Sequence, residues 1–314
     1  MTQLISAVLP SLADTQLLEA NLPPLLRELE AWNAEVVVVD DTGTGVLSAW
    51  LADRFSDLPA GRLRVISRDE NGGFGPALLN GARLARGEYL LALNPDVRVR
   101  PGFLAPLLDA LGDPEVFAAS PRVLLNGEPS RPESHNALLM DDGHLRVVAR
   151  EDSGRSDPVP IPFAIGGALL MRRSEFLAGG GFDPLFAPFY WEDVDLCLSA
   201  WRTGRRVVEI PLSVVEHHHR GTIGGAVPKQ VVLAAIEKNR HLLLWKHLDD
   251  ADVARDHVTA IWRDALDASM AGRREELVWL ALALQELPRV TESRAELGAR
   301  PVTLEAALRR SDPA

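Results

Sequence analysis

Two adjacent carboxylates, Asp40 and Asp41, follow the β-branched run 36–39. A buried strand that ends in carboxylates removes them from water, which is unfavourable unless a nucleobase, ribose hydroxyls or a cation interacts with them. The pair is therefore a candidate contact for a nucleotide. The alternative is that one of them, Asp41 more readily than Asp40, only caps the helix that follows. The nearby glycines do not complete a dinucleotide motif, because Ser48 stands where the third glycine belongs.

A glycine-rich loop and a further strand-end carboxylate form the second group. Residues 71–75, Asn-Gly-Gly-Phe-Gly, lead into a predicted helix, where glycine N–H groups can approach a phosphate or a base edge closely. A simple tight turn is the alternative. Residues 94–96, Asn-Pro-Asp, follow the apolar run 89–93, which places Asp96 on the same sheet edge as Asp40. An oxygen ligand there can hold Mg²⁺ or Mn²⁺ between the two phosphates of a sugar nucleotide.

Three acids, Glu192, Asp193 and Asp195, begin a predicted helix directly after the aromatic run 189–191. The helix macrodipole favours negative charge in a first turn and explains one or two of them. It does not explain the aromatic residues, whose faces can pack against the C–H surface of a sugar. A carboxylate beside such a shelf is the group that an acceptor hydroxyl needs as general base.

Three consecutive histidines, 217–219, follow a strand-like run. A solvated loop is one interpretation. Imidazole is the commonest nitrogen ligand for divalent ions, and an adjacent arginine, Arg220, can pair with phosphate. We favour one metal ligand among the three histidines.

The composition limits the partners of the chain. With a net charge of −11, the protein repels the phosphate backbone, so no nucleic-acid partner is expected. Cys197 is the single cysteine, which excludes an internal disulfide, and we expect it to be buried. We interpret the N-terminus as a first strand and not as a signal peptide, and no run of about 18 apolar residues is present in the sequence. We therefore expect a cytoplasmic protein, with peripheral contact at a membrane left open.

Strands and helices alternate up to about residue 120. The predicted strands are 4–9, 36–39, 64–66 and 89–93, and the predicted helices between them are 15–32, 46–55 and 76–86. This alternation favours an α/β fold with a mainly parallel, doubly wound sheet. Ligands of such sheets bind beyond the carboxyl ends of the strands, where the carboxylates above lie.

The stretch 126–162 is polar and lacks sustained periodicity, which predicts a long, mobile excursion over the active face. Apolar order returns at 165–171, followed by a helix at 192–203 and a strand at 206–210.

After about Pro228 the pattern is helical, with predicted helices at 231–247, 253–271 and 274–287. We divide the chain into a catalytic domain, 1–225, and a C-terminal helical region, 226–314. An apolar stripe on the last predicted helix is expected to face the core, with a dimer seam and a membrane-facing stripe as alternatives. The stripe consists of Leu277, Leu280, Ala281 and Leu284.

In this order, the four groups resemble the inverting family-2 glycosyltransferases with the GT-A fold, in particular the rhamnosyltransferase-like branch. The resemblance covers about residues 4–225. Its matches are Asp40, the loop 71–75, the tripeptide 94–96 in place of an Asp-x-Asp, Gly166-Gly167-Ala168 before an arginine pair, Gly181-Phe182-Asp183, and Glu192-Asp193. Two departures, Thr42-Gly43 where the family has Gly-Ser and Leu79 where an asparagine is usual, weaken the inference on donor-base contacts.

The resemblance implies a nucleotide-diphosphate sugar donor, UDP- or dTDP-linked, a divalent cation, and a hydroxyl acceptor on a glycan or lipid-linked glycan. It implies that Asp40 contacts the donor base, that Asp96 binds the metal, and that Asp193 is the general base. The predicted site residues are Asp193 and Glu192 for catalysis; Pro10, Asp40, Asp41, Asn71, Gly72, Gly73, Phe74, Asn94, Gly167 and Trp191 for the donor; and Asp96, His217 and His218 for Mg²⁺ or Mn²⁺.

Two alternatives to a glycosyltransferase stay open. One is an inactive module that binds a sugar nucleotide or a glycan. The other is a sugar nucleotidyltransferase, which shares the sheet and the metal but needs a glycine-rich basic loop after the first strand, where residues 10–13 read Pro-Ser-Leu-Ala. A homodimer is also left open.

Overall fold

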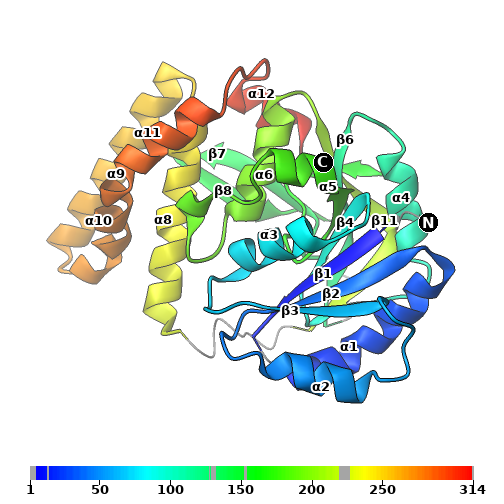
Figure 1. The fold of residues 1–314 in the computed structure, drawn as a ribbon. Helices are drawn as coiled ribbons and strands as arrows, with labels where there is room; N and C mark the ends of the chain where they lie inside the picture. The colour runs from blue at the N-terminus through cyan, green and yellow to red at the C-terminus, as the bar shows by residue number, and fades with distance from the viewer. Residues whose placement is uncertain are drawn as a thin grey trace.

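The computed structural model describes residues 5–12, 14–126, 128, 132–151, 154–218 and 227–312. Within these residues a nine-stranded sheet forms the centre, in the order β3-β2-β1-β4-β10-β6-β11-β5, with β9 paired to β11 (Figure 1). Its strands are β1 Ile5–Ser11, β2 Ala34–Asp40, β3 Leu63–Ser67, β4 Tyr89–Leu93, β5 Val97–Val99, β6 Val116–Leu125, β9 Val159–Pro160, β10 Ala168–Arg172 and β11 Arg206–His217.

The first four strands confirm the predicted doubly wound α/β architecture. β3, β2, β1 and β4 are parallel. Beyond them the sheet is mixed, because β10 runs antiparallel to β4 and β6, whereas β6 and β11 are parallel. The carboxyl ends of β2 and β4 therefore meet at one edge, as the sequence predicts.

Helices cover both faces of this sheet. They are α1 Thr15–Glu28, α2 Val46–Arg54, α3 Phe74–Leu84, α4 Leu104–Leu111, α5 Arg173–Ala178 and α6 Glu192–Arg202. Successive strand residues point to opposite faces, so Val36 and Val38 join the core under α1, α2 and α4, whereas Val37 and Val39 join the core under α3, α5 and α6. A strand buried on both faces needs the continuous apolar run that β2 has.

The polar stretch 126–162 contains a hairpin that its weak periodicity did not predict, and the expected mobility of this stretch stays a prediction. β7 Asn136–Asp141 and β8 His144–Ala149 pair antiparallel around Asp142-Gly143, both in the left-handed region with φ of 47° and 79°. An Asp-Gly pair is a typical two-residue hairpin turn. The apolar residues Leu138 and Leu145 are buried in the core under α3, α5 and α6, and the hairpin contacts helices α8 (Lys229–His247) and α12 (Leu304–Arg310).

Helices make up the C-terminal region from Lys229 onward. They are α8 Lys229–His247, α9 Ala251–Met270, α10 Val278–Gln285, α11 Leu287–Glu296 and α12 Leu304–Arg310. The buried residues Leu242, Leu243 and Leu244 of α8 belong to the core under α3, α5 and α6. The predicted boundary between 225 and 226 falls outside the described residues and stays a prediction.

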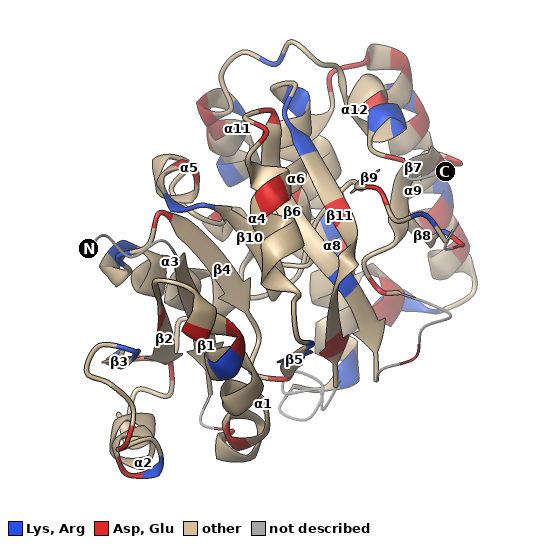
Figure 2. Cartoon of the chain, turned by 90° about the vertical axis from the view of Figure 1, so that its right-hand side faces the viewer, with Lys and Arg blue, Asp and Glu red and all other residues tan. Residues whose placement is uncertain are grey.

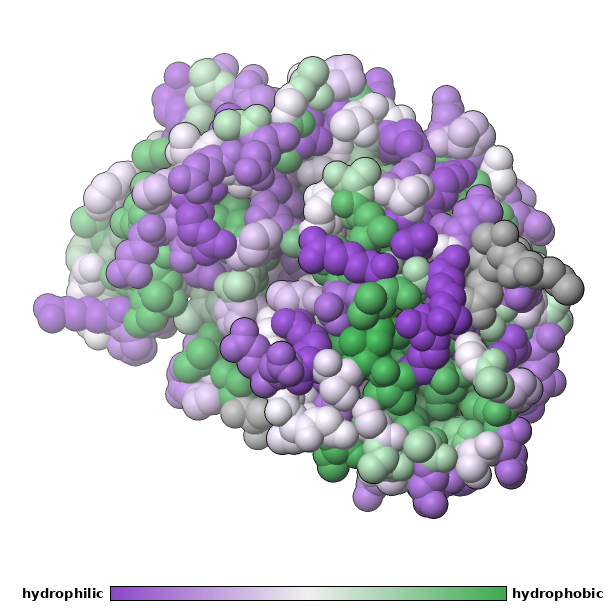
Figure 3. Space-filling view, viewed as in Figure 1, coloured by the Kyte–Doolittle hydropathy of each residue, from purple (hydrophilic) through white to green (hydrophobic). Residues whose placement is uncertain are grey.

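The apolar stripe of the last predicted helix does not face the core. Ala281 is exposed and Leu284 is 50% exposed, whereas Ala283 is fully buried and Trp279 stacks on His241 of α8. The helix is thus rotated relative to our expectation, and apolar surface is visible over α10 (Figure 3). None of the described helices is both long enough and apolar enough to cross a bilayer. Acidic and basic residues are intermixed along the elements drawn in Figure 2.

Candidate active site

Asp40 ends β2, and its side chain is fully enclosed. Its Oδ1 accepts hydrogen bonds from the N–H (3.1 Å) and hydroxyl (2.6 Å) of Thr42, and its Oδ2 accepts one from the N–H of Leu47 (3.0 Å) in the first turn of α2. The N-cap residue of α2 is Gly45, and it is Asp40, not Asp41, whose carboxylate accepts an N–H of the first turn. With three donors and no exposed surface, Asp40 shapes the loop, and its contact with a donor base stays a prediction.

Asp41 connects the end of β2 to the glycine-rich loop. Its carboxylate accepts hydrogen bonds from the N–H groups of Gly72 (3.1 and 3.2 Å to the two oxygens) and Gly73 (2.8 Å), and it forms an ion pair with Nε of Arg68 at 3.3 Å. Asn71 Oδ1 also accepts from Gly73 (3.0 Å). A Cβ at position 72 would lie 2.5 Å from the Arg68 guanidinium, so a larger residue there would displace the end of the Arg68 side chain that pairs with Asp41.

The other predicted donor residues lie along the same edge. Pro10 is buried in β1 opposite Val39. Asn94 follows β4 and donates its N–H to the carbonyl of Gly167 at 2.8 Å. A Cβ at position 167 would lie 2.2 Å from Asn94 Cγ, so only glycine fits beside this amide.

Asp96 and His217 are brought together by strand pairing. Val97 of β5 lies opposite His217 of β11, and the Nε2 atom of His217 lies 3.3 Å from Oδ1 of Asp96. Nδ1 of the same imidazole lies 2.7 Å from Oε2 of Glu133. Burial lowers the pKa of His217, but hydrogen bonds and charges from the two carboxylates outweigh it and raise that pKa to about 9.

The Asp96–His217 pair has the chemistry of a partial metal site. Oδ1 of Asp96 is buried and lacks a well-formed hydrogen bond within the part of the chain that the structure describes. Carboxylate oxygen and imidazole nitrogen are both ligands of divalent ions. Across the described ranges, no group of three or more His, Cys, Asp or Glu side chains is arranged to hold a metal ion. The remaining ligands would therefore have to come from elsewhere, such as phosphate oxygens of a nucleotide.

His218 lies apart from this pair. Its Nε2 atom is 3.4 Å from Glu216 and its side chain is 37% exposed, although its backbone N–H donates to the carbonyl of Asp96 at 3.0 Å. His219 and Arg220 lie outside the described residues. Sequence reasoning missed Glu133, because a contact between residues 84 positions apart leaves no local pattern.

Asp193 lies in the first turn of α6 against Gly166. Its Oδ2 accepts the N–H of Gly166 at 2.8 Å, and its Oδ1 accepts the N–H of Val194 at 2.8 Å. Burial raises the pKa of Asp193 despite these bonds. Burial and the charge of Asp193 raise the pKa of Glu192 to about 8. Glu192 therefore retains its proton at neutral pH.

The glycine-rich loop and the acidic helix meet at Gly166. A Cβ built at position 166 would lie 3.2 Å from Cβ of Asp193 and 3.3 Å from the ring of Phe74. The structure thus brings Phe74 of the predicted donor loop to the predicted base. These residues are far apart in the sequence and belong to α3 and α6.

The aromatic shelf differs from our expectation. Trp191 is only 8% exposed and belongs to the core under α3, α5 and α6, whereas Tyr190 is 40% exposed. Both residues have left-handed backbone, with φ of 71° and 76°. Trp191 therefore offers no open ring face to a sugar. Asp195 is also buried, and it pairs with Nζ of Lys246 at 2.7 Å and Nε2 of His247 at 2.8 Å.

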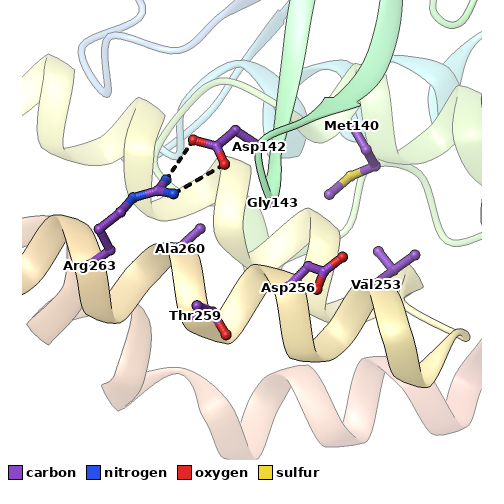
Figure 4. A pocket seen from close by; sticks show the side chains of 8 residues that line it. All are labelled: Met140, Asp142, Gly143, Val253, Asp256, Thr259, Ala260 and Arg263. Carbon is purple, nitrogen blue, oxygen red and sulfur yellow. Dashed lines mark hydrogen bonds and ion pairs between the residues drawn. The ribbon is translucent and has the colours of Figure 1, made fainter.

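Two surface cavities, of about 380 and 430 Å³, lie outside this group. The first is lined by the turn of the β7–β8 hairpin and by α9, where Asp142 pairs with Arg263 at 2.8 Å (Figure 4). Neither cavity is lined by any predicted site residue.

Comparison with known proteins agrees with this picture. Residues 6–177 match a family model described as "Glycosyl transferase family 2". The chain is 27% identical over 227 residues to polypeptide N-acetylgalactosaminyltransferase 6 of Bos taurus, covering 67% of this chain and 36% of the relative. It is 26% identical over 212 residues to polypeptide N-acetylgalactosaminyltransferase 10 of Homo sapiens, covering 64% and 35%. The chain thus spans about a third of the length of these relatives.

A solved structure confirms the predicted GT-A type fold. The crystal structure of GalNAc-T7 with UDP, GalNAc and Mn²⁺ superimposes with a TM-score of 0.71 at 17% identity, covering 98% of this chain and 56% of that one. A mannosyltransferase from Pyrobaculum calidifontis, in complex with GDP-Man and Mn²⁺, gives a TM-score of 0.53 at 17% identity over 94% of this chain and 87% of that one.

Proposed function

The chain belongs to glycosyl transferase family 2, and on this premise we propose that it transfers a sugar from a nucleotide-diphosphate donor to a hydroxyl acceptor. The observation that carries the proposal is the meeting of Phe74 and Asp193 at Gly166. It joins a loop suited to a nucleotide to a carboxylate suited to deprotonate a hydroxyl. The UDP and GDP-Man named in the similar structures support a donor of this class.

We propose that Asp96 and His217 hold Mn²⁺ or Mg²⁺. Glu133 accepts the hydrogen of Nδ1 and so directs Nε2 of His217 toward Asp96, which is how outer carboxylates orient metal-binding imidazoles. A divalent cation, when bound, supplies positive charge next to the leaving diphosphate. The Mn²⁺ named in both similar structures supports a metal of this kind.

The proposed reaction is a direct displacement that inverts the anomeric centre. The acceptor oxygen bonds to the anomeric carbon, the bond from that carbon to the diphosphate oxygen breaks, and the acceptor proton passes to the carboxylate of Asp193. Burial strengthens Asp193 as a base, because it raises the pKa of this group. Glu192 stays protonated at neutral pH and limits the negative charge beside it.

For the substrates we propose a UDP- or dTDP-sugar and a hydroxyl on a glycan or lipid-linked glycan, as in the rhamnosyltransferase-like branch. The similarity to polypeptide N-acetylgalactosaminyltransferases 6 and 10 favours a second candidate, in which the sugar is N-acetylgalactosamine and the acceptor is a polypeptide hydroxyl.

The test is a transfer assay with UDP-, dTDP- and GDP-sugars, with and without Mn²⁺, on glycan and polypeptide acceptors. We expect metal-dependent release of the nucleotide diphosphate and a product of inverted configuration by NMR. Donor binding without transfer or hydrolysis would identify a binding module. Pyrophosphate release from a nucleoside triphosphate and a sugar phosphate would identify a nucleotidyltransferase. Retained configuration would remove Asp193 as the base of a direct displacement.

A further inference from the structure

Helix α8 holds the backbone that leads into the proposed base. Asn239 of α8 is fully buried, and its Nδ2 atom lies 2.6 Å from the carbonyl oxygen of Phe186 and 2.9 Å from those of Phe189 and Tyr190. The surrounding acceptors fix the orientation of the amide, because a flipped Oδ1 would face three carbonyl oxygens. Oδ1 itself has no hydrogen-bond partner among the described residues. The N–H groups of the Asn239 amide therefore bind only the segment 186–190.

A second side chain of α8 reaches the same segment. Lys238 is 8% exposed, and its Nζ donates to the carbonyl of Ala187 at 2.8 Å. Arg289 of α11 donates to the carbonyl of Pro184 at 2.8 Å. Five carbonyls between residues 184 and 190 are therefore bound by side chains of the C-terminal helices. In Figure 1, α8 runs past the turn that enters α6.

The held segment adopts an uncommon backbone conformation. Tyr190 and Trp191 both have positive φ, which residues other than glycine seldom adopt without support from their surroundings. Asn239 binds the carbonyls of Phe189 and Tyr190, at the start of this turn. The next two residues are Glu192 and Asp193. A displacement of the turn would therefore also displace the carboxylate of Asp193.

Helix α8 also binds the residues on either side of this segment, Asp183 before it and Asp195 after it. Nζ of Lys246 lies 2.7 Å from Oδ2 of Asp183 and 2.7 Å from Oδ2 of Asp195. His247 contacts the other oxygen of Asp195 at 2.8 Å, and Ser293 of α11 donates to Asp183 at 2.5 Å. These contacts belong to the ends, whereas Asn239 and Lys238 hold the middle, where the backbone turns.

We propose that Asn239, assisted by Lys238, is a positioning residue for glycosyl transfer: it holds the turn at 189–191 so that Asp193 meets the acceptor hydroxyl. The inference rests on the proposed function. It assigns to the C-terminal helices a direct part in arranging the acceptor side of the site. Neither side chain forms a hydrogen bond with the donor loop among the described residues, so we expect turnover to respond more strongly than donor binding.

The experiment compares Asn239→Ala and Lys238→Met with the parent enzyme. For Asn239→Ala we expect kcat to fall by about tenfold to a hundredfold, the scale of a misplaced catalytic group, with the dissociation constant of the donor unchanged. Lys238→Met keeps the aliphatic stem and removes one bond, so it should show a smaller fall in kcat. Hydrogen exchange of the amides at 189–195 should be faster in both variants, with that of the loop 71–75 unchanged.

Leu243→Ala is the matched control, because it weakens the buried side of α8 without removing a hydrogen bond to the segment. It should lower the melting temperature while leaving kcat and exchange at 189–195 close to the parent. A kcat for Asn239→Ala within about threefold of the parent, or an equal loss in Leu243→Ala, would overturn the inference. If the parent transfers no sugar, the proposed function fails, and the exchange data still decide whether Asn239 holds the turn.

Discussion

The backbone N–H of Gly166 donates to Oδ2 of Asp193 at 2.8 Å, across a position where a side chain would press on both Asp193 and Phe74. This contact fixes one oxygen of the proposed base and brings β10's entry turn, α3 and α6 together. A residue larger than glycine at 166 would have to move either the base or the donor loop. The glycine therefore serves the geometry of the site as well as the turn before β10.

Asp193→Asn should separate catalysis from binding. The amide cannot accept the acceptor proton, so we expect turnover to fall by about a hundredfold or more, the usual scale for a lost general base. Donor affinity in the presence of Mn²⁺, measured by calorimetric titration, should stay nearly intact. If donor affinity falls as much as turnover, Asp193 binds the donor or the metal. The base would then be sought in Glu192, since Asp195 is tied to Lys246.

Asp96→Ala and His217→Ala should each abolish the part of donor binding that depends on a divalent ion. Each variant removes one side of the Asp96–His217 pair, and a two-residue site cannot spare either. His218→Ala is the control, because that side chain contacts Glu216. Calorimetric titration of the donor with and without Mn²⁺ gives the answer. Unchanged metal-dependent affinity in Asp96→Ala would remove Asp96 from the ligands, and a full loss in His218→Ala would assign the second ligand to His218.

Asp41→Ala should weaken donor binding through the loop 71–75. The variant leaves the N–H of Gly72 without its acceptor, the N–H of Gly73 with only Asn71 Oδ1, and Arg68 without its partner, so we expect a loss of about 1–3 kcal/mol in stability and a lower donor affinity. Thermal unfolding and a donor thermal-shift series measure both. Glu70→Ala, an exposed acid beside the same loop, should change neither quantity. An equal effect at both positions would point to net charge as the cause.

Glu192→Gln should change how stability depends on pH. The unfolded chain ionises Glu192 near its ordinary pKa of 4.5, whereas the folded protein keeps it protonated up to about 8. The folded state thus binds more protons in this window, and stability falls as pH rises through it. Glutamine removes this loss. The melting temperature of the variant relative to the parent should therefore increase between about pH 5 and about pH 8; a constant difference would show that burial does not hold the proton on Glu192.

The place of the strand-end carboxylates was predictable, because the apolar run before each of them identifies a strand and the end of that run fixes where the strand stops. A continuous apolar run identifies a strand buried on both faces, and parallel strands bring Asp40, Asp41 and Asp96 to one edge. Which of the first two holds the glycine loop was not predictable. That depends on the direction in which each side chain leaves the strand end, and here Asp40 points to α2 and Asp41 to Gly73.

Other features depend on contacts between distant segments. Glu133 reaches His217 from a stretch that composition alone presents as a loop. Trp191 reads as part of an exposed shelf, but the left-handed backbone at 190–191 accompanies its burial in the core. The β7–β8 hairpin had a readable signal in Asp142-Gly143 between two short apolar runs, and the surrounding polar residues obscured it.

The ammonium of Lys246 joins Asp183 to Asp195 and so closes the chain between them into a ring. The entropic cost of closing such a ring belongs to the whole segment and not to any single residue in it. The two ends share a single nitrogen, so both attachments weaken together when that nitrogen moves away, and each end is left with one further partner, Ser293 for Asp183 and His247 for Asp195. The acceptor side of the site should therefore loosen as one cooperative unit and not residue by residue.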